Sequence, residues 1–345
     1  MKQAILNFML AGGAFAPFRF ANRSKLVILT YHRFSERDEG AMKTSARQFA
    51  AQLDYLAAHY TLIPLSLVAE RLARGESLPP RAAVVTIDDG YRDAYTIAFP
   101  ILRRRHLPAT LFVATEFVDR RIWLWTDKLR YLTARTDAAQ LAADIGGQTL
   151  RCELSGADSR LTAATRVNSA LKSLPDGEKD AALSAIAATL GVPLPELPPA
   201  EFGPLTWDEA RELDAAGIRI GSHTRTHPIL TNVTDENLRR ELRESKARLE
   251  DMLNRSVELF CYPNGDTDAR VRGEVERANY KCAVTTLPGL NDGRSDPLSL
   301  YRVPAENDLA HFAQATSGFD QLKDKLRPAR PKTASVLAYE LGLTL

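Results

Sequence analysis

Cysteine is scarce in this sequence. The 345 residues include three cysteines, Cys152, Cys261 and Cys282, and no two of them form a C-x-x-C pair. An odd, widely spaced set of thiols excludes a disulfide framework, and it leaves the redox compartment of the protein open. We interpret all three side chains as buried reduced thiols, which behave in a core as small hydrophobic groups.

A strong charge of one sign and long apolar runs are also absent. The formal net charge is +2, and aromatic residues are not interleaved with basic clusters, so nucleic acid is not expected as a partner. No segment reaches the ~20 consecutive apolar residues that a membrane-spanning helix needs. The hydrophobic fraction of 45% is ordinary for a soluble globular protein with a large core, and nothing indicates an obligate protein partner.

The N-terminal segment, residues 1–24, has two interpretations. A mostly apolar run from Ala4 to Phe15 ends in a small-x-small pattern, which resembles a signal peptide with its cleavage site. Asn7 and two glycines interrupt that run, which favours a retained amphipathic helix, packed on the domain or lying on a membrane surface. A cytoplasmic or membrane-associated location is therefore expected ahead of a secreted or periplasmic one.

Short apolar runs rich in β-branched residues alternate with helical patterns along most of the chain. Near-continuous apolarity in such short runs is typical of parallel strands that are buried on both faces of a sheet. The alternation predicts a repeated strand–helix fold, and seven candidate strands favour a distorted (β/α)7 barrel over an open sheet. The candidate strands are Leu26–Tyr31, Ala82–Ile87, Thr110–Ala114, Ile218–Ser222, Leu259–Tyr262, Ala283–Thr286 and Leu300–Val303.

The pattern changes between about residues 118 and 204. Two helical stretches, separated by a polar segment near Gly146, are followed by a proline-rich linker from Pro193 to Pro204. We interpret residues 118–204 as a helical insertion in a barrel domain that covers residues 25–320. Residues 321–345 are expected to form a peripheral C-terminal tail.

Two carboxylates stand at the end of one predicted strand, in the segment Thr86-Ile87-Asp88-Asp89-Gly90. Active sites of barrel enzymes lie at this end of the strands. Neighbouring residues that leave a strand point in different directions, so one carboxylate can bind a metal while the other reaches a water on it. An Asp-Gly turn or a helix cap would explain the same residues without any chemistry.

Two histidines follow another predicted strand, in Ser222-His223-Thr224-Arg225-Thr226-His227. Their spacing brings both imidazoles to one side of a helical turn or tight loop. Neutral imidazoles bind Zn²⁺ and similar ions, and two histidines with one aspartate leave coordination positions open for water and substrate. The pair is therefore a candidate metal site, although a single histidine at such a place is more often structural.

The two motifs together, in this order, resemble the first and second signature motifs of the polysaccharide deacetylase superfamily, the NodB-homology fold of carbohydrate esterase family 4. Either motif alone is weak, but their combination is specific. The resemblance covers roughly Lys25 to Phe319 and is weakest across the insertion. It implies that Asp89, His223 and His227 hold a metal ion and that Asp88 is the general base that activates water.

A third family motif is matched by Phe260-Cys261-Tyr262-Pro263-Asn264-Gly265, and it implies that the Asn264 N–H stabilises the tetrahedral oxyanion. A plain turn is the alternative for this segment. Cys261 replaces an arginine that many family members carry, and Arg302 is a candidate to supply the missing charge, unless it is an ordinary surface or ion-pair arginine. Arg302, Tyr262 and Trp125 are assigned to substrate binding, while packing inside the insertion would equally explain Trp125.

The family's C-terminal Leu-x-His, whose imidazole protonates the leaving amine, has no convincing copy. His311 follows Leu309-Ala310, but it falls in a predicted helix beyond the last strand. His32 is the better candidate, because Leu29-Thr30-Tyr31-His32 resembles the L-x-Y-H strand of a permuted branch that includes poly-N-acetylglucosamine deacetylases. A structural histidine at a strand end is the alternative.

The predicted function is metal-dependent hydrolysis of N-acetyl groups on an N-acetylhexosamine-containing polysaccharide of the exopolysaccharide or biofilm type, with release of acetate. Zn²⁺ is the expected ion from the ligand types, with Co²⁺ or Ni²⁺ as alternatives. Two other functions stay open: hydrolysis of a non-sugar amide or an O-acetyl ester at the same site, and carbohydrate binding without catalysis. The intact set of Asp88, Asp89, His223 and His227 argues against a non-catalytic barrel.

Overall fold

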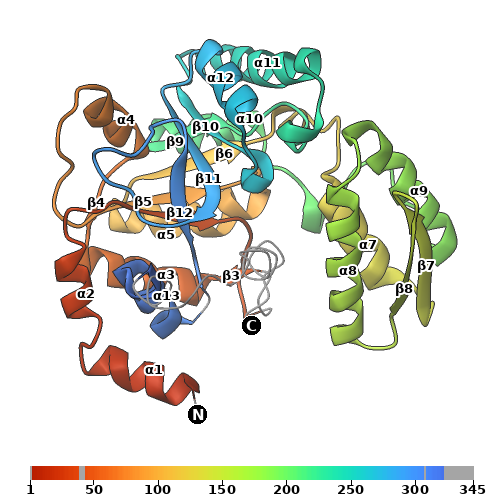
Figure 1. The fold of residues 1–345 in the computed structure, drawn as a ribbon, viewed down its shortest axis with the longest axis horizontal. Coiled ribbons are helices and arrows are strands. Elements are labelled where there is room, and N and C mark those ends of the chain that lie inside the picture. The colour runs from red at the N-terminus through yellow and green to blue at the C-terminus, as the bar shows by residue number, and fades with distance from the viewer. Residues whose placement is uncertain (1, 39–42, 307, 322–345) are drawn as a thin grey trace.

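The computed structural model describes residues 2–38, 43–306 and 308–321. At its centre seven parallel strands close into a barrel in the order β1-β12-β11-β10-β9-β6-β5, with β5 pairing back to β1 (Figure 1). This confirms the predicted distorted barrel and, with small differences in bounds, all seven predicted strands. The strands are β1 (Val27–Tyr31), β5 (Ala82–Ile87), β6 (Ala109–Val113), β9 (Ile218–Ser222), β10 (Leu259–Cys261), β11 (Cys282–Pro288) and β12 (Leu300–Pro304).

The barrel is irregular at two places. The two-residue β4 (Thr61–Leu62) pairs with the start of β5, whereas β6 pairs with its end at Thr86 and Ile87. The pairing of β11 with β12 shifts register between Val284 and Pro288. A further two-stranded sheet, β2 (Phe34–Ser35) and β3 (Thr44–Ser45), lies beyond the end of β1.

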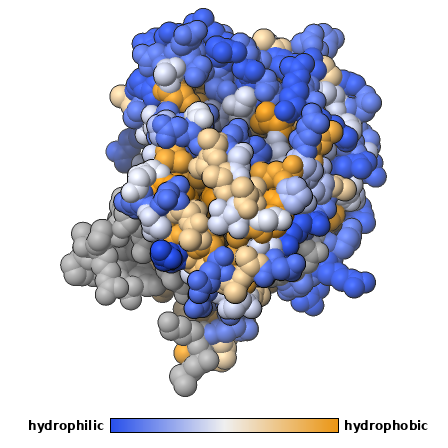
Figure 2. Space-filling view, turned by 90° about the vertical axis from the view of Figure 1, so that its right-hand side faces the viewer, coloured by the Kyte–Doolittle hydropathy of each residue, from blue (hydrophilic) through white to orange (hydrophobic). Residues whose placement is uncertain are grey.

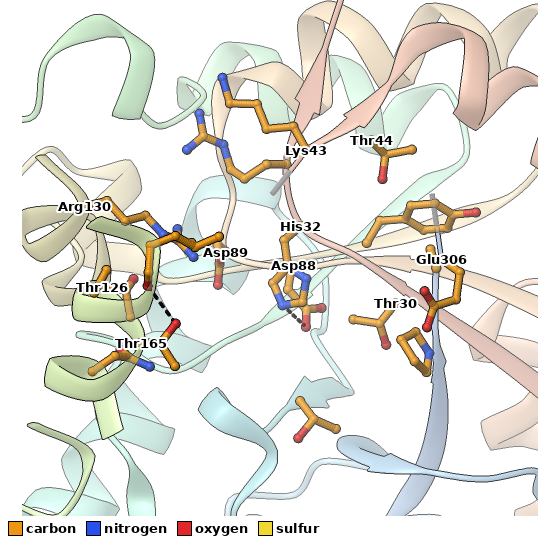
Figure 3. A pocket seen from close by; sticks show the side chains of 18 of the residues that line it. Thr30, His32, Lys43, Thr44, Asp88, Asp89, Thr126, Arg130, Thr165 and Glu306 are labelled. Carbon is orange, nitrogen blue, oxygen red and sulfur yellow. Dashed lines mark hydrogen bonds and ion pairs between the residues drawn. The ribbon is translucent and has the colours of Figure 1, made fainter. Parts of the chain in front are cut away.

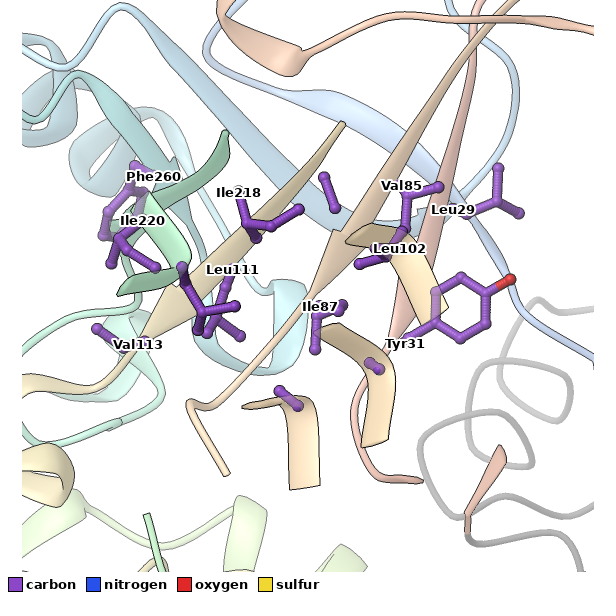
Figure 4. Close-up of a cluster of buried hydrophobic side chains, with 14 of the residues drawn as sticks. Leu29, Tyr31, Val85, Ile87, Leu102, Leu111, Val113, Ile218, Ile220 and Phe260 are labelled. Atoms are coloured by element: carbon purple, nitrogen blue, oxygen red, sulfur yellow. The ribbon is translucent and has the colours of Figure 1, made fainter. Parts of the chain in front are cut away.

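Alternate side chains of the strands belong to two hydrophobic clusters. Leu29 and Val85 pack in the larger cluster, which also contains Leu102 of a surrounding helix (Figure 4). Ile28 and Val84, their neighbours in the sequence, belong to a second cluster and therefore point to the opposite face, into the barrel. Both faces of the strands are buried, which explains why the runs read as continuously apolar.

Helices surround the barrel, and their ends follow local signals. Capping boxes are formed by Ser45 with Gln48 and by Thr206 with Glu209, as the S/T-x-x-E/Q pattern favours. The helices of the barrel domain are α3 (Ala46–His59), α4 (Leu65–Ala73), α5 (Phe99–Arg105), α6 (Thr115–Val118), α10 (Trp207–Ala215), α11 (Asp235–Leu253), α12 (Ala269–Arg277) and α13 (Leu309–Ser317).

The insertion is a small subdomain with a hydrophobic core of its own (Figure 1). Its elements are α7 (Trp125–Arg135), β7 (Gln140–Ile145), β8 (Gln148–Glu153), α8 (Ala157–Lys172) and α9 (Lys179–Leu190). The polar segment near Gly146 is therefore not a simple break between helices. Gly146 and Gly147 have φ of 58° and 77°, the left-handed conformations of a tight two-residue turn, so the flanking residues pair as an antiparallel hairpin.

The outer surface of the insertion is mixed in character. Seen from the side of the insertion, hydrophilic residues cover the top and the edges of this face of the molecule, and groups of hydrophobic residues lie in its middle (Figure 2). Among the described residues of the insertion, Leu197 is the large hydrophobic residue that is strongly exposed, at 54%.

Two helices form the N-terminal segment, α1 (Lys2–Ala11) and α2 (Ala16–Ala21). Phe15 between them is buried, and its ring meets Phe319 edge to face. Within the described ranges, no helix combines the length and apolar character needed to cross a membrane. The expected C-terminal tail lies outside the described residues, except for its first residue.

Candidate active site

Asp88 and Asp89 leave the end of β5 inside the ring of strand ends. The Asp88 N–H donates to the Tyr31 carbonyl of the adjacent β1 at 2.9 Å, which continues the sheet pairing by one residue. Asp89 then turns away with φ of 75°, a conformation that only a small fraction of non-glycine residues adopt. Gly90 follows with φ of 91°, and a Cβ there would lie 2.9 Å from the Val113 side chain, so glycine is required. The two carboxylates consequently point in different directions.

The structure brings Asp89, His223 and His227 together. Oδ1 of Asp89 is 3.4 Å from Nε2 of His223 and 3.3 Å from Nε2 of His227. The Nδ1 of His223 lies 2.8 Å from the carbonyl oxygen of Cys261, which can only accept a hydrogen bond. Nδ1 therefore carries a proton, and Nε2 is the ring nitrogen that faces Asp89 and is available to a metal ion, an arrangement found in histidines that bind metals.

Burial and partners keep Asp89 ionised. Burial by itself would raise the pKa of the Asp89 carboxyl, but His223 and His227 hold this pKa well below its ordinary value. The side chain is 12% exposed, so the anion lies in a largely enclosed site with an opening to the cleft. An anionic oxygen and two imidazole nitrogens in such a place form a donor set for a divalent cation.

The loop that carries the two histidines is held by Glu241 of α11, a residue that belongs to none of the sequence motifs. Its carboxylate accepts hydrogen bonds from the N–H groups of Arg225 and Thr226, at 2.9 and 2.8 Å, and from the Thr226 hydroxyl. His227 adopts φ of 61°, which requires such external support. In the sequence, Glu241 could not be distinguished from the other charged residues of α11. Only the fold shows that its side chain is buried, with 6% exposed.

Arg302 holds Asp88 from inside the barrel. Its two terminal nitrogens donate to the two carboxylate oxygens at 2.8 and 2.7 Å, and its Nε donates to the Thr285 carbonyl at 2.6 Å. Burial by itself would raise the pKa of Asp88, but the charge and hydrogen bonds of Arg302 lower it. Arg302 is 1% exposed, so it contacts the aspartate rather than the cleft, and the assignment of Arg302 to substrate binding needs this correction.

Cys261 occupies the space beside this ion pair. Its Sγ lies 3.2 Å from the Arg302 guanidinium and 3.5 Å from Asp88. Asp88, His223 and Cys261 also lie close enough together to hold a metal ion. Burial raises the pKa of the Cys261 thiol, and Arg302 engages both Asp88 oxygens, so this second group is the weaker donor set.

Both candidate general acids reach the same cavity. His32 follows β1 with its side chain 43% exposed, and its Nε2 lies 3.7 Å from Asp88 (Figure 3). His311 belongs to α13, and its Nδ1 lies 3.1 Å from Asp308 at the start of the same helix. The structure thus places His32 directly beside the candidate base, while the choice between the two histidines stays a prediction.

The third motif forms a tight turn at the edge of the site. Asn264 adopts φ of 59° in the short 3₁₀ turn Pro263–Gly265 and lines the cavity. Tyr262 also lines it, but the ring is buried and its hydroxyl donates to the Leu298 carbonyl at 2.8 Å, so this hydroxyl is engaged elsewhere. Trp125 is 9% exposed, reaches the cavity wall, and belongs mainly to the core of the insertion.

The cavity extends far beyond these residues. Its volume is about 1600 Å³, and it lies between the strand ends of the barrel and helices α7 and α8 of the insertion. In Figure 3, Thr126, Arg130 and Thr165 of the insertion stand on one side of His32 and Asp88. The volume exceeds the ~300–1,000 Å³ typical of pockets for small ligands, so the cavity is large enough for an extended molecule.

A buried polar network joins the catalytic loops to the insertion. The Tyr91 hydroxyl, two residues beyond Asp89, donates to the Asp127 carboxylate of α7 at 2.6 Å. The Arg33 guanidinium, next to His32, lies 4.0 Å from the centre of the Tyr91 ring. These contacts were not expected from the sequence, because the residues are distant along the chain and follow no motif.

A solved structure and two curated relatives resemble this chain. The Streptococcus pyogenes deacetylase PplD, solved in complex with acetate, covers 85% of this chain and 98% of its own with a TM-score of 0.57 and 19% identity, a likeness of fold. The YxkH protein of Bacillus subtilis (strain 168), whose name assigns it to the polysaccharide deacetylases, is 22% identical over 282 residues, which are 81% of this chain and 71% of that protein.

The second relative is the poly-beta-1,6-N-acetyl-D-glucosamine N-deacetylase of Escherichia coli (strain K12). It is 29% identical over 96 residues, which are 27% of this chain and 14% of that protein. The family model of polysaccharide deacetylase matches residues 75–195 and 200–283, more than half of the chain. The protein therefore belongs to the polysaccharide deacetylase family, and its chemistry is that of a deacetylase hydrolase.

Proposed function

We propose that this protein is a metal-dependent N-deacetylase that removes acetyl groups from an N-acetylhexosamine polymer. The observation that carries the proposal is the cluster of Asp89, His223 and His227 beside Asp88 at the floor of the large cavity. Asp89, His223 and His227 would bind the cation, and the adjacent Asp88 carboxylate would stay available to act as a base. This is the division of roles that hydrolysis of an amide requires.

The donor set fits a tetrahedral ion such as Zn²⁺. Bonds of about 2.0–2.1 Å to such an ion place its ligand atoms ~3.4 Å apart. The Asp89 oxygen lies 3.4 and 3.3 Å from the two histidine nitrogens. Imidazole and carboxylate donors also accept Co²⁺ or Ni²⁺. When bound, the ion would polarise the acetyl carbonyl and lower the pKa of water.

The protein's own groups would move the protons. Asp88 is held as an anion by Arg302 and can accept a proton from the attacking water. The N–H of Asn264 lies in the turn beside the site and would donate to the oxyanion that forms on the acetyl carbon. His32 would then give a proton to the leaving nitrogen, so that it departs as an amine.

Two observations support a polymeric amino sugar as substrate. The cavity of about 1600 Å³ is open to more than one sugar unit. The Escherichia coli relative is named for its action on poly-beta-1,6-N-acetyl-D-glucosamine. An N-acetylated exopolysaccharide is therefore the substrate class that we propose.

The test is acetate release from N-acetylglucosamine oligomers by wild type and Asp88→Asn, with and without a chelator. We expect release only from the wild type with metal. Metal binding without acetate release from any oligomer would reject the sugar substrate and turn attention to amides and O-acetyl esters. Absence of metal binding would reject the proposal as a whole.

A further inference from the structure

Helices α7 and α8 form one complete side of the cavity, opposite the strand ends. Along α8, the residues that line the cavity recur at helical spacing and so share one face. They are Ala157, Arg160, Leu161, Ala164, Thr165, Asn168 and Lys172. Thr126, Arg130 and Thr133 of α7 continue this surface, which we call the insertion wall.

The insertion wall is supported from behind. Ala163, Val167 and Leu171 occupy an adjoining face of α8 and are buried in the core of the insertion. The wall residues Leu161 and Ala164 lie outside this core and are half-buried against the cavity. One face of the helix thus stabilises the subdomain, and the other is left to contact whatever fills the cavity.

The wall is also fixed relative to the catalytic loops at both ends. Asp127 of α7 accepts the hydrogen bond from Tyr91 at 2.6 Å. Near the end of α8, the Asn232 side chain, which follows the histidine loop, donates to the Lys172 carbonyl at 2.8 Å. A molecule that touches the wall therefore lies at a defined position relative to Asp88 and Asp89.

The chemistry of the wall suits sugar rings. Thr126, Asn168 and Arg160 bring hydroxyl, amide and guanidinium groups, which pair with hydroxyl and acetamide oxygens. Leu161 and Ala164 bring a small apolar surface between them, which suits the C–H face of a pyranose. Among the described cavity-lining residues of α7 and α8, none is acidic, so the wall has no carboxylate to attract a cationic ligand.

We infer that the insertion wall binds the sugar units next to the one that is deacetylated, and so makes the enzyme select long chains over short ones. The inference rests on the proposed function, because it takes the polymer as the ligand. It assigns a role in binding to a segment that supplies none of the catalytic residues. Oligomer length is the variable that separates this role from catalysis itself.

The experiment measures the affinity of N-acetylglucosamine oligomers, from the disaccharide to the hexasaccharide, by calorimetry. The Asp88→Asn protein serves as the parent, so that the oligomers are not consumed. Ala164→Trp then places a bulky side chain on the insertion wall, because Ala164 is half-buried on the cavity side of α8. Thr162→Trp is the matched control, because Thr162 is exposed on the same helix and does not line the cavity.

In the parent and the control, affinity should rise with oligomer length. Ala164→Trp should lower the affinity for the hexasaccharide about tenfold, equivalent to ~1.4 kcal/mol, and leave the affinity for the disaccharide unchanged. Affinity that does not depend on length in the parent, or an equal loss for both oligomers in Ala164→Trp, would overturn the inference.

Failure of the proposed function has a different signature. Oligomers would then bind with the length dependence described above, while wild type releases no acetate from any of them. Thermal unfolding of both tryptophan variants reports whether each is folded. A folded Ala164→Trp protein that binds the hexasaccharide as tightly as the parent rejects the wall as a binding site.

Discussion

Arg302 and Asp88 form a bidentate ion pair in which each side chain is 1% exposed. The arginine comes from β12 and the aspartate from the end of β5, so the pair joins two strands that do not neighbour each other in the closed barrel. Because both carboxylate oxygens are bound, the aspartate has one fixed orientation. The third-motif position 261, where a cysteine stands, lies directly against the same guanidinium.

Replacing this arginine should be costly. In Arg302→Met the Asp88 charge would stay buried without its partner, and a loss of about 3–5 kcal/mol in unfolding free energy is expected. Acetate release should fall with it, because the base loses its orientation. Urea unfolding and steady-state kinetics measure the two effects. Arg302→Lys is the control that keeps the charge and loses the fork geometry; full stability and activity of Arg302→Met would contradict the assignment.

Metal binding should require the histidine pair. His227→Ala removes one of the three donors and should reduce the bound metal, measured as metal content after dialysis, together with acetate release. His106→Ala is the matched control, because His106 is an exposed residue at the end of α5. Chelation should abolish activity and added Zn²⁺ should restore it. Equal metal content in His227→Ala and wild type would reject the ligand set.

Substrates with different leaving groups should show whether His32 or His311 is the general acid. A general acid contributes about 10²–10⁴-fold to rate, so His32→Ala should lose activity in this range on N-acetyl substrates. Hydrolysis of 4-nitrophenyl acetate should change little, because nitrophenolate leaves without a proton. His311→Ala should retain most activity on both substrates. The reverse pattern would transfer the role of acid to His311, and equal losses on both substrates would indicate a structural role.

The barrel could be predicted from the sequence because its signals are local. Parallel strands buried on both faces read as short apolar runs, and each run from Leu26 to Val303 that showed this pattern forms a strand. The carboxylates and histidines could be placed together because parallel strands end at the same side of a barrel. Motif order then gave the family, which the match over residues 75–195 and 200–283 confirms.

The remaining features depend on contacts that no local pattern encodes. The hairpin around Gly146 has alternation too weak to separate it from a loop, because its exposed face carries mixed residues. The sequence alone does not distinguish Glu241 from the other charged residues of α11, because its burial depends on the fold. Arg302 could be linked to the site by its charge, but its pairing with Asp88 depends on the closure of the barrel.

The link between Tyr91 and Asp127 can be tested by a double-mutant cycle. Asp127 is 0% exposed, and its carboxylate also receives a hydrogen bond from Arg130 at 3.1 Å. Tyr91→Phe leaves the carboxylate with one partner fewer and should cost about 1–3 kcal/mol of unfolding free energy. Asp127→Asn should cost a similar amount, because Arg130 and Tyr91 lose the anion. Since both variants remove the same contact, the double variant should be more stable than the sum predicts, by about 0.5–3 kcal/mol. Urea unfolding of the four proteins measures this coupling, and strictly additive losses would show that the contact does not join the insertion to the metal-ligand loop.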